Sequence, residues 1–165
     1  MKIIDDKIID AVIESLDTLE DEYDRQVSEF YKQQPVIASF MESEQTGILS
    51  DEERDFLEYL ALVIYKAVEK VEKKVPAVSE EQLEEVEEKN WDMLENAKGK
   101  TFTDRVDVFF EDYEQEDLLA FVEDSLVFDP DDDEANMDFL TDEGREPMFV
   151  ILKTIIDALE SATSK

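Results

Sequence analysis

Apolar residues recur at every third or fourth position through most of the chain. Between about residue 5 and residue 31 the large apolar side chains keep this spacing throughout, at Ile9, Val12, Ile13, Leu16, Leu19, Tyr23, Val27 and Phe30. Such spacing places apolar side chains on one face of a helix. The pattern therefore predicts one long amphipathic helix over this region.

Two capping boxes mark the starts of further helices. Ser50 with Glu53 three residues later, and Ser79 with Gln82, have the pairing in which a hydroxyl and a carboxyl or amide group satisfy backbone N–H groups reciprocally. The first box opens a helix predicted over about 51–74. Its centre is apolar on every side, which is typical of a helix buried in the middle of a bundle.

Prolines, glycines and threonines bound the remaining predicted elements. These are a short helix from Pro35 that ends before Gly47, a fourth helix that ends at Gly99, a fifth from Thr103, a sixth from about Asp117 to Leu126, and a last over about 142–162. Only three Gly and four Pro occur in 165 residues, whereas β architectures need such residues at most turns. We therefore predict an all-α fold, a helical bundle of about six to seven helices in a single domain over residues 1–165.

The two most hydrophobic helices have related sequences. When residues 50–70 are set against 141–161, six of 21 positions are identical: Asp51/Asp142, Glu52/Glu143, Arg54/Arg145, Ile64/Ile155, Ala67/Ala158 and Glu69/Glu160. Upstream, Gln33 aligns with Gln115, and Phe40 aligns with Phe121 after one gap. The matches keep their order across three helices.

This order predicts two pseudo-symmetric repeats, residues 1–75 and 79–163, packed through the helices at about 51–74 and 142–162. The acidic stretch 129–134 falls where the second copy is longer, so we interpret it as an insertion. The alternative is that any two acidic amphipathic helices behind a capping box look alike.

The charge is strongly unbalanced. There are 47 acidic and 16 basic residues, for a formal net charge of −31. This charge repels nucleic-acid phosphates and anionic membrane surfaces, so we expect direct binding to neither. A basic protein is the partner that the charge favours.

Self-repulsion of this size predicts that added salt stabilises the protein. The Debye length falls from about 30 Å at 0.01 M salt to about 3 Å at 1 M, which screens repulsion between carboxylates. Thermal unfolding followed by circular dichroism should therefore show a melting temperature that rises with NaCl concentration. A flat or falling melting temperature would contradict this expectation.

Familiar catalytic chemistry is scarce in this sequence. The chain has no Cys and no His, which excludes thiol catalysis and iron–sulfur clusters and removes the commonest general base and zinc ligand. We therefore predict no catalytic residues, no cofactor and no enzymatic activity. Asp5 and Asp6 interrupt the apolar start of the chain, which argues against a secretory signal and favours a cytoplasmic location.

The acidic stretch near residue 130 invites a calcium hypothesis, since clustered carboxylates suit hard cations. Its members are Asp129, Asp131, Asp132, Asp133 and Glu134. A calcium loop that starts at Asp129 has Glu134 where Gly is required and Leu140 where a bidentate Glu is required. We therefore predict a solvated loop without a metal site.

The candidate partner-binding residues are charged side chains in three places. They are Glu80, Glu84, Glu87 and Glu88 of the fourth helix, the residues Asp129 and Asp131 to Glu134 of the acidic stretch, and the two matched arginines Arg54 and Arg145. The sequence favours a non-enzymatic interaction or adaptor protein, as a monomer or homodimer. Three alternatives stay open: a DNA mimic that inhibits a nucleic-acid-binding protein, acidity that reflects a saline cytoplasm, and catalysis by carboxylates, Tyr or Ser.

Overall fold

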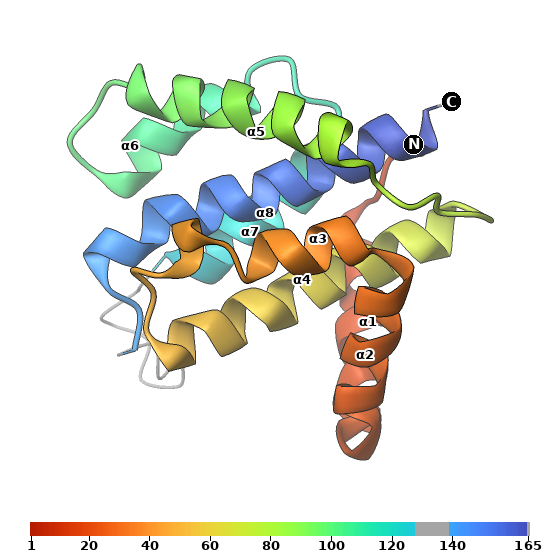
Figure 1. The fold of residues 1–165 in the computed structure, drawn as a ribbon. Helices are drawn as coiled ribbons and strands as arrows, with labels where there is room; N and C mark the ends of the chain where they lie inside the picture. The colour runs from red at the N-terminus through yellow and green to blue at the C-terminus, as the bar shows by residue number, and fades with distance from the viewer. Residues whose placement is uncertain (128–138, 165) are drawn as a thin grey trace.

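The computed structural model describes residues 1–127 and 139–164, and every regular element among them is helical (Figure 1). The α-helices are α1 (Asp6–Thr18), α2 (Tyr23–Gln33), α3 (Pro35–Met41), α4 (Asp51–Val71), α5 (Glu80–Glu95), α6 (Phe102–Val106), α7 (Glu116–Leu126) and α8 (Asp142–Thr163). Three short 3₁₀ helices also occur: η1 (Glu20–Glu22), η2 (Glu44–Thr46) and η3 (Asp107–Phe110). The all-α prediction is confirmed, and the predicted count of six to seven helices is too low.

The extra helix arises because the first predicted helix is broken. α1 ends at Thr18, and the chain passes through η1 before α2 begins. The Leu19 N–H donates to the Leu16 carbonyl, a shorter step than the regular helical bond. Both α1 and α2 pack against α4. The break therefore lets the apolar faces of two separate helices cover α4, although the apolar spacing in the sequence is continuous.

The fourth predicted helix ends earlier than Gly99. α5 stops at Glu95, and Gly99 lies in the loop before α6 with a positive φ of 128°. A Cβ built on Gly99 would lie 2.6 Å from the Asp104 Cβ. Gly99 therefore allows the loop to pass close to α6, and it does not cap α5. α6 begins after Thr101, whose hydroxyl accepts from the Asp104 N–H.

α4 and α8 form the centre of the molecule. All six residues from Leu60 to Tyr65 are buried in α4, and all nine from Met148 to Ile156 are buried in α8. α8 lies between α5 and α4 in Figure 1 and contacts both, while α7 packs on α8 and α1 on α4. Within the described ranges, no helix has the length and apolar character needed to cross a membrane.

Candidate functional site

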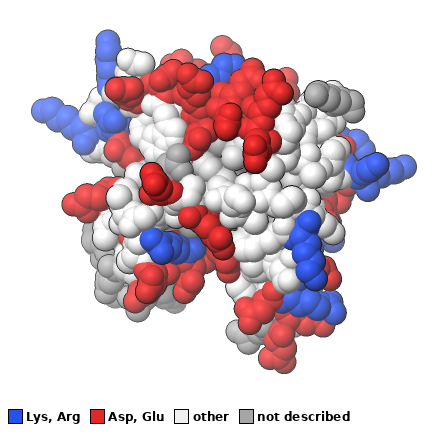
Figure 2. Space-filling view, in the orientation of Figure 1, with Lys and Arg blue, Asp and Glu red and all other residues white. Residues whose placement is uncertain are grey.

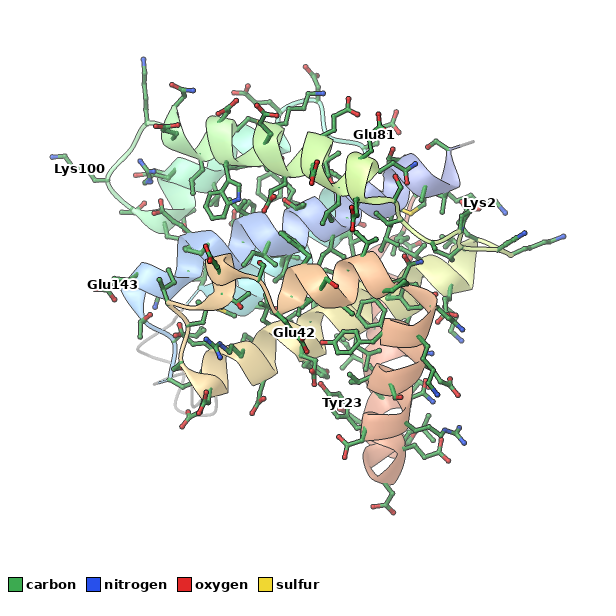
Figure 3. The ribbon with its side chains drawn as sticks, in the orientation of Figure 1. Lys2, Tyr23, Glu42, Glu81, Lys100 and Glu143 are labelled. Atoms are coloured by element: carbon green, nitrogen blue, oxygen red, sulfur yellow. The ribbon has the colours of Figure 1, made fainter. Side chains whose placement is uncertain are left out.

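The outer face of α5 carries a dense array of carboxylates. Leu83, Asn90 and Leu94 are buried on the inner face, so the helix turns its acidic residues outward. Seven of them are exposed: Glu80, Glu81, Glu84, Glu85, Glu88, Asp92 and Glu95. We call these seven residues the α5 acidic face. Figure 2 shows acidic side chains gathered along α5, and Figure 3 shows Glu81 pointing away from the body of the molecule.

No ion pair among the described residues involves the α5 acidic face. The helix itself contributes one lysine, Lys89, which is exposed. Like charges spaced three or four residues apart on a helix repel each other. Seven carboxylates against one lysine leave α5 with a large excess of negative charge.

Glu87 differs from the other predicted glutamates of α5 because it is half-buried. Burial raises the pKa of its carboxyl group, and the neighbouring charge of Glu84 adds to this, while a hydrogen bond with Trp91 opposes it. Glu87 therefore packs beside Trp91 at the edge of the α5 acidic face rather than on it.

The two matched arginines lie in the first turns of α4 and α8. Arg54 is exposed, and its Nε donates to the Thr46 carbonyl at 3.1 Å. Arg145 is half-buried, with a guanidinium nitrogen 3.9 Å from Asp142. Its Nε is buried and has no hydrogen-bond partner among the described residues. Neither arginine is hydrogen-bonded or ion-paired to α5, so the structure does not join the predicted basic and acidic residues into one described site.

Basic side chains gather between the start of α8 and the loop before α6. Lys100, Arg105 and Arg145 line a cavity of about 420 Å³ there. Arg105 is engaged, since it pairs with Glu146 and donates to the carbonyls of Ala97 and Leu94. Lys100 extends outward, away from the molecule (Figure 3). Arg105 therefore ties the α5–α6 loop to α8.

A single carboxylate caps two helices. The Glu53 Oε1 accepts from the Ser50 N–H at 3.0 Å, as the capping box at the start of α4 predicts. The Glu53 Oε2 accepts from both the N–H and the hydroxyl of Thr141 at 3.1 Å, and Thr141 is the N-cap of α8. Glu53 is only 1% exposed. It therefore fastens the starts of the two central helices to each other.

These hydrogen bonds control the ionisation of Glu53. Burial alone raises its pKa, but the hydrogen bonds from Ser50 and Thr141 outweigh burial, so the pKa lies below the usual value. Gly144 makes room for the carboxylate, because a Cβ at that position would lie 2.3 Å from the Glu53 Oε2. In the alignment of 50–70 with 141–161, Gly144 is the residue matched to Glu53.

A buried polar network holds α5 on α8. Lys153 is 5% exposed, and its Nζ donates to the Asn90 Oδ1 at 3.0 Å and to the Asp157 Oδ2 at 2.7 Å. The same Nζ lies 4.6 Å from the centre of the Tyr113 ring. Asn90 also donates to Asp157 and to the hydroxyl of Thr154. The network is closed by the Tyr113 hydroxyl, which donates to the Asp157 Oδ1 at 2.6 Å.

The ionisable groups of this network are paired with one another. Burial raises the pKa of the Tyr113 phenol, and the negative charge of Asp157 raises it further. The phenol therefore stays protonated and keeps donating. Both oxygens of Asp157 and the ammonium of Lys153 are occupied by partners of the same chain. No prediction from the sequence includes these residues, although Lys153 and Asp157 stand four apart inside an apolar helix.

Two buried glutamines, Gln34 and Gln115, each hold a neighbouring chain segment by donating and accepting hydrogen bonds through the side-chain amide. The Gln34 side chain donates to the Pro76 carbonyl at 3.0 Å and accepts from the Val78 N–H at 2.9 Å. The Gln115 side chain donates to the carbonyl of residue 2 and accepts from the N–H of residue 4, both at 3.0 Å. Each glutamine clamps the segment that leads into a helix, α5 in the first case and α1 in the second.

The acidic stretch of the sequence and the comparisons with known proteins remain to be placed. The acidic stretch Asp129 and Asp131 to Glu134 lies outside the described residues. Among the residues that are described, no group of three or more Asp or Glu side chains is arranged to hold a metal ion. The chain matches no family model, no curated protein and no solved structure with which it was compared.

Proposed function

We propose that this protein is a non-enzymatic interaction or adaptor protein that binds a basic protein partner through the α5 acidic face. The observation that carries the proposal is the row of seven exposed carboxylates on α5 without an ion pair in the described part of the chain. The setting expected from the sequence is the cytoplasm.

The energetics favour a cationic partner. Each like-charge pair at helical spacing costs about 0.2–0.5 kcal/mol, and α5 contains several such pairs. A basic surface that docks on this helix relieves the repulsion and gains attraction at the same time. Complementary charge accelerates association and makes binding depend on salt. Partner binding is therefore expected to weaken as ionic strength rises.

The test is affinity capture from a lysate of the source organism. We expect the wild-type protein to retain a specific basic protein at 50 mM NaCl and to release it at 500 mM. The triple variant Glu80→Gln, Glu84→Gln, Glu88→Gln should lose most of this partner at 50 mM NaCl, because it removes three of the seven charges with little change in side-chain size. Quantitative mass spectrometry of the retained proteins measures the loss.

The matched control changes net charge equally at exposed positions outside α5: Glu14→Gln, Glu29→Gln and Glu114→Gln. It should retain the partner as the wild type does. Equal losses in the two variants would show that only net charge matters, and retention at 500 mM NaCl would contradict an electrostatic interface. Either result removes the proposal.

The alternative function is DNA mimicry, and the charge density of α5 supports it. A helix of 16 residues is about 24 Å long, so seven charges give about one per 3.4 Å, similar to a single DNA strand. Duplex DNA should then displace the captured partner in competition. If a DNA-binding partner is recovered and duplex DNA does not displace it, the mimic is excluded.

We also propose that the chain is a tandem of two related units, residues 1–75 and 79–163. The two glutamine clamps support this, because Gln34 and Gln115 each precede a short helix and hold the segment entering α5 or α1. They also change the alignment by one residue, since Gln34 rather than Gln33 has the contacts that match Gln115. With that change, one constant offset relates Gln34 and Phe40 to Gln115 and Phe121.

A further inference from the structure

A groove lies between α1 and α7, two helices that pack against each other. It encloses about 350 Å³, and Ile9 and Phe121 are among the apolar residues that line it. Asp6 and Asp10 of α1 and Asp117 and Asp124 of α7 also line it. We call it the α1–α7 groove.

The groove combines an apolar floor with an acidic rim. Ala120 and Phe121 are half-buried and present apolar surface to a side chain that enters, whereas Ile9 is only 3% exposed. All four aspartates are exposed, and none takes part in an ion pair among the described residues. An occupant therefore needs an apolar group and cations together.

The spacing of the rim residues defines the occupant further. Asp6 and Asp10 are four residues apart, and Asp117 and Asp124 are seven apart. Each pair therefore follows one face of its helix, and the groove has a carboxylate row on each wall. The negative field extends along α7, where burial first, and then the charges of Asp124 and Asp107, raise the pKa of Glu123.

We propose that the α1–α7 groove binds an amphipathic cationic helix of a partner protein. A large apolar side chain of that helix packs on Ala120 and Phe121, and lysines or arginines one turn before and after it meet the aspartates. Helices that lay an apolar face in a groove are a recurrent recognition mode. The proposal rests on the proposed function for the basic character of the partner, and it adds a second contact that lies on α1 and α7 rather than on α5. A second copy of this chain is disfavoured as occupant by its charge of −31.

The test uses a fluorescently labelled 14-residue peptide of Leu, Lys and Ala, with Leu in one helical stripe and Lys beside it. The control peptide has the same composition in an order that disperses the Leu residues around the helix. Fluorescence anisotropy at 50 mM NaCl should show at least tenfold tighter binding of the ordered peptide. Equal binding of both peptides, or no binding of the ordered one, overturns the proposal, because charge attraction alone does not distinguish the two orders.

Two matched variants locate the binding. Asp10→Asn with Asp124→Asn removes one charge from each wall of the α1–α7 groove, and neither residue lies in the first turn of its helix. We expect this variant to weaken binding of the ordered peptide at least fivefold. Glu84→Gln with Glu88→Gln makes the same charge change on the α5 acidic face and should weaken it less than twofold.

The outcomes separate this inference from the proposed function. If the α5 variant loses the peptide and the groove variant retains it, the groove is overturned and the α5 interface stands. Methyl NMR spectra give an independent readout, in which the Ile9 signal should shift on peptide addition while methyl groups packed under α5, such as those of Leu83, stay in place. The reverse pattern of shifts also overturns the groove, whereas failure of the lysate capture leaves the peptide result valid and removes the α5 interface alone.

Discussion

Replacing Asp157 with Ala is expected to lower the free energy of unfolding by about 3–5 kcal/mol, the cost typical of breaking a buried ion pair. Among the described residues, the substitution leaves the ammonium of Lys153 beneath α5 with Asn90 and the rings of Tyr113 and Phe109. It also removes the acceptor of the Tyr113 hydroxyl. Urea unfolding monitored by circular dichroism measures the difference.

Two further variants distinguish the ion pair from general damage to α8. Lys153→Met combined with Asp157→Ala should be more stable than Asp157→Ala alone, because it removes the uncompensated buried charge. Asp92→Ala, an exposed aspartate of the α5 acidic face, should change stability by less than about 0.5 kcal/mol. An Asp157→Ala variant that is as stable as Asp92→Ala would mean that Lys153 reaches water and that the network has no energetic role.

Local sequence signals were sufficient for most helices. The capping boxes at Ser50 and Ser79 are present as predicted, because each depends on residues only three positions apart. The buried centres of α4 and α8 could be predicted because no exposed face remains in a helix that is apolar all round. The break between α1 and α2 could not, since the apolar spacing continues through it and only packing against α4 separates the two helices.

Long-range contacts explain what the sequence could not reveal. The second half of the Glu53 cap lies 88 positions away in Thr141, and the partners of Lys153 include Asn90, 63 positions away. The capping box already gives the Glu53 side chain a hydrogen-bond partner, so nothing in the local sequence indicates that it also binds a second helix. Lys153 and Asp157 did carry a signal, because two charges four apart in an apolar helix have to pair when both are buried.

The two candidate sites also differ in how far the sequence predicts them. The α5 acidic face could be predicted because its residues lie on one helix, and helical periodicity alone separates them from Leu83 and Leu94. The α1–α7 groove could not, because Asp10 and Asp124 belong to helices distant in the sequence. Clamping of residues 2 and 4 by Gln115 holds the segment entering α1 at the start of α7. The same kind of glutamine contact that supports the repeat proposal thus also positions one wall of the groove.

Replacing Gly144 with Ala is expected to destabilise the protein by about 1–3 kcal/mol, the usual cost of overpacking a buried site. At an ordinary helix position the same change stabilises by about 0.5–1 kcal/mol. Here the new methyl group meets the Glu53 Oε2 at 2.3 Å and the Thr141 hydroxyl at 2.9 Å. The clash displaces the carboxylate that caps α4 and α8. Thermal and urea unfolding measure the loss.

The decisive measurement repeats Gly144→Ala in a Glu53→Ala background, which lacks the carboxylate. Glu53→Ala alone should cost about 1–3 kcal/mol, since it removes the shared acceptor of the Ser50 and Thr141 N–H groups. In that background Gly144→Ala should cost clearly less than in the wild type, because the contact with the Glu53 Oε2 is gone and only the 2.9 Å approach to the Thr141 hydroxyl remains. Additive effects of the two substitutions would contradict the shared cap.

The Glu53 carboxylate should also make the stability of the protein depend on pH, and the Glu53→Ala variant tests this. The pKa of Glu53 is lowered in the folded protein, so its contribution is complete above the unfolded pKa of about 4.3 and is lost as the pH falls through the lower folded value. The stability difference between wild type and Glu53→Ala should therefore be constant near neutral pH and shrink below about pH 4. A difference that persists unchanged into strong acid would mean that the side chain acts by packing rather than by its charged hydrogen bonds.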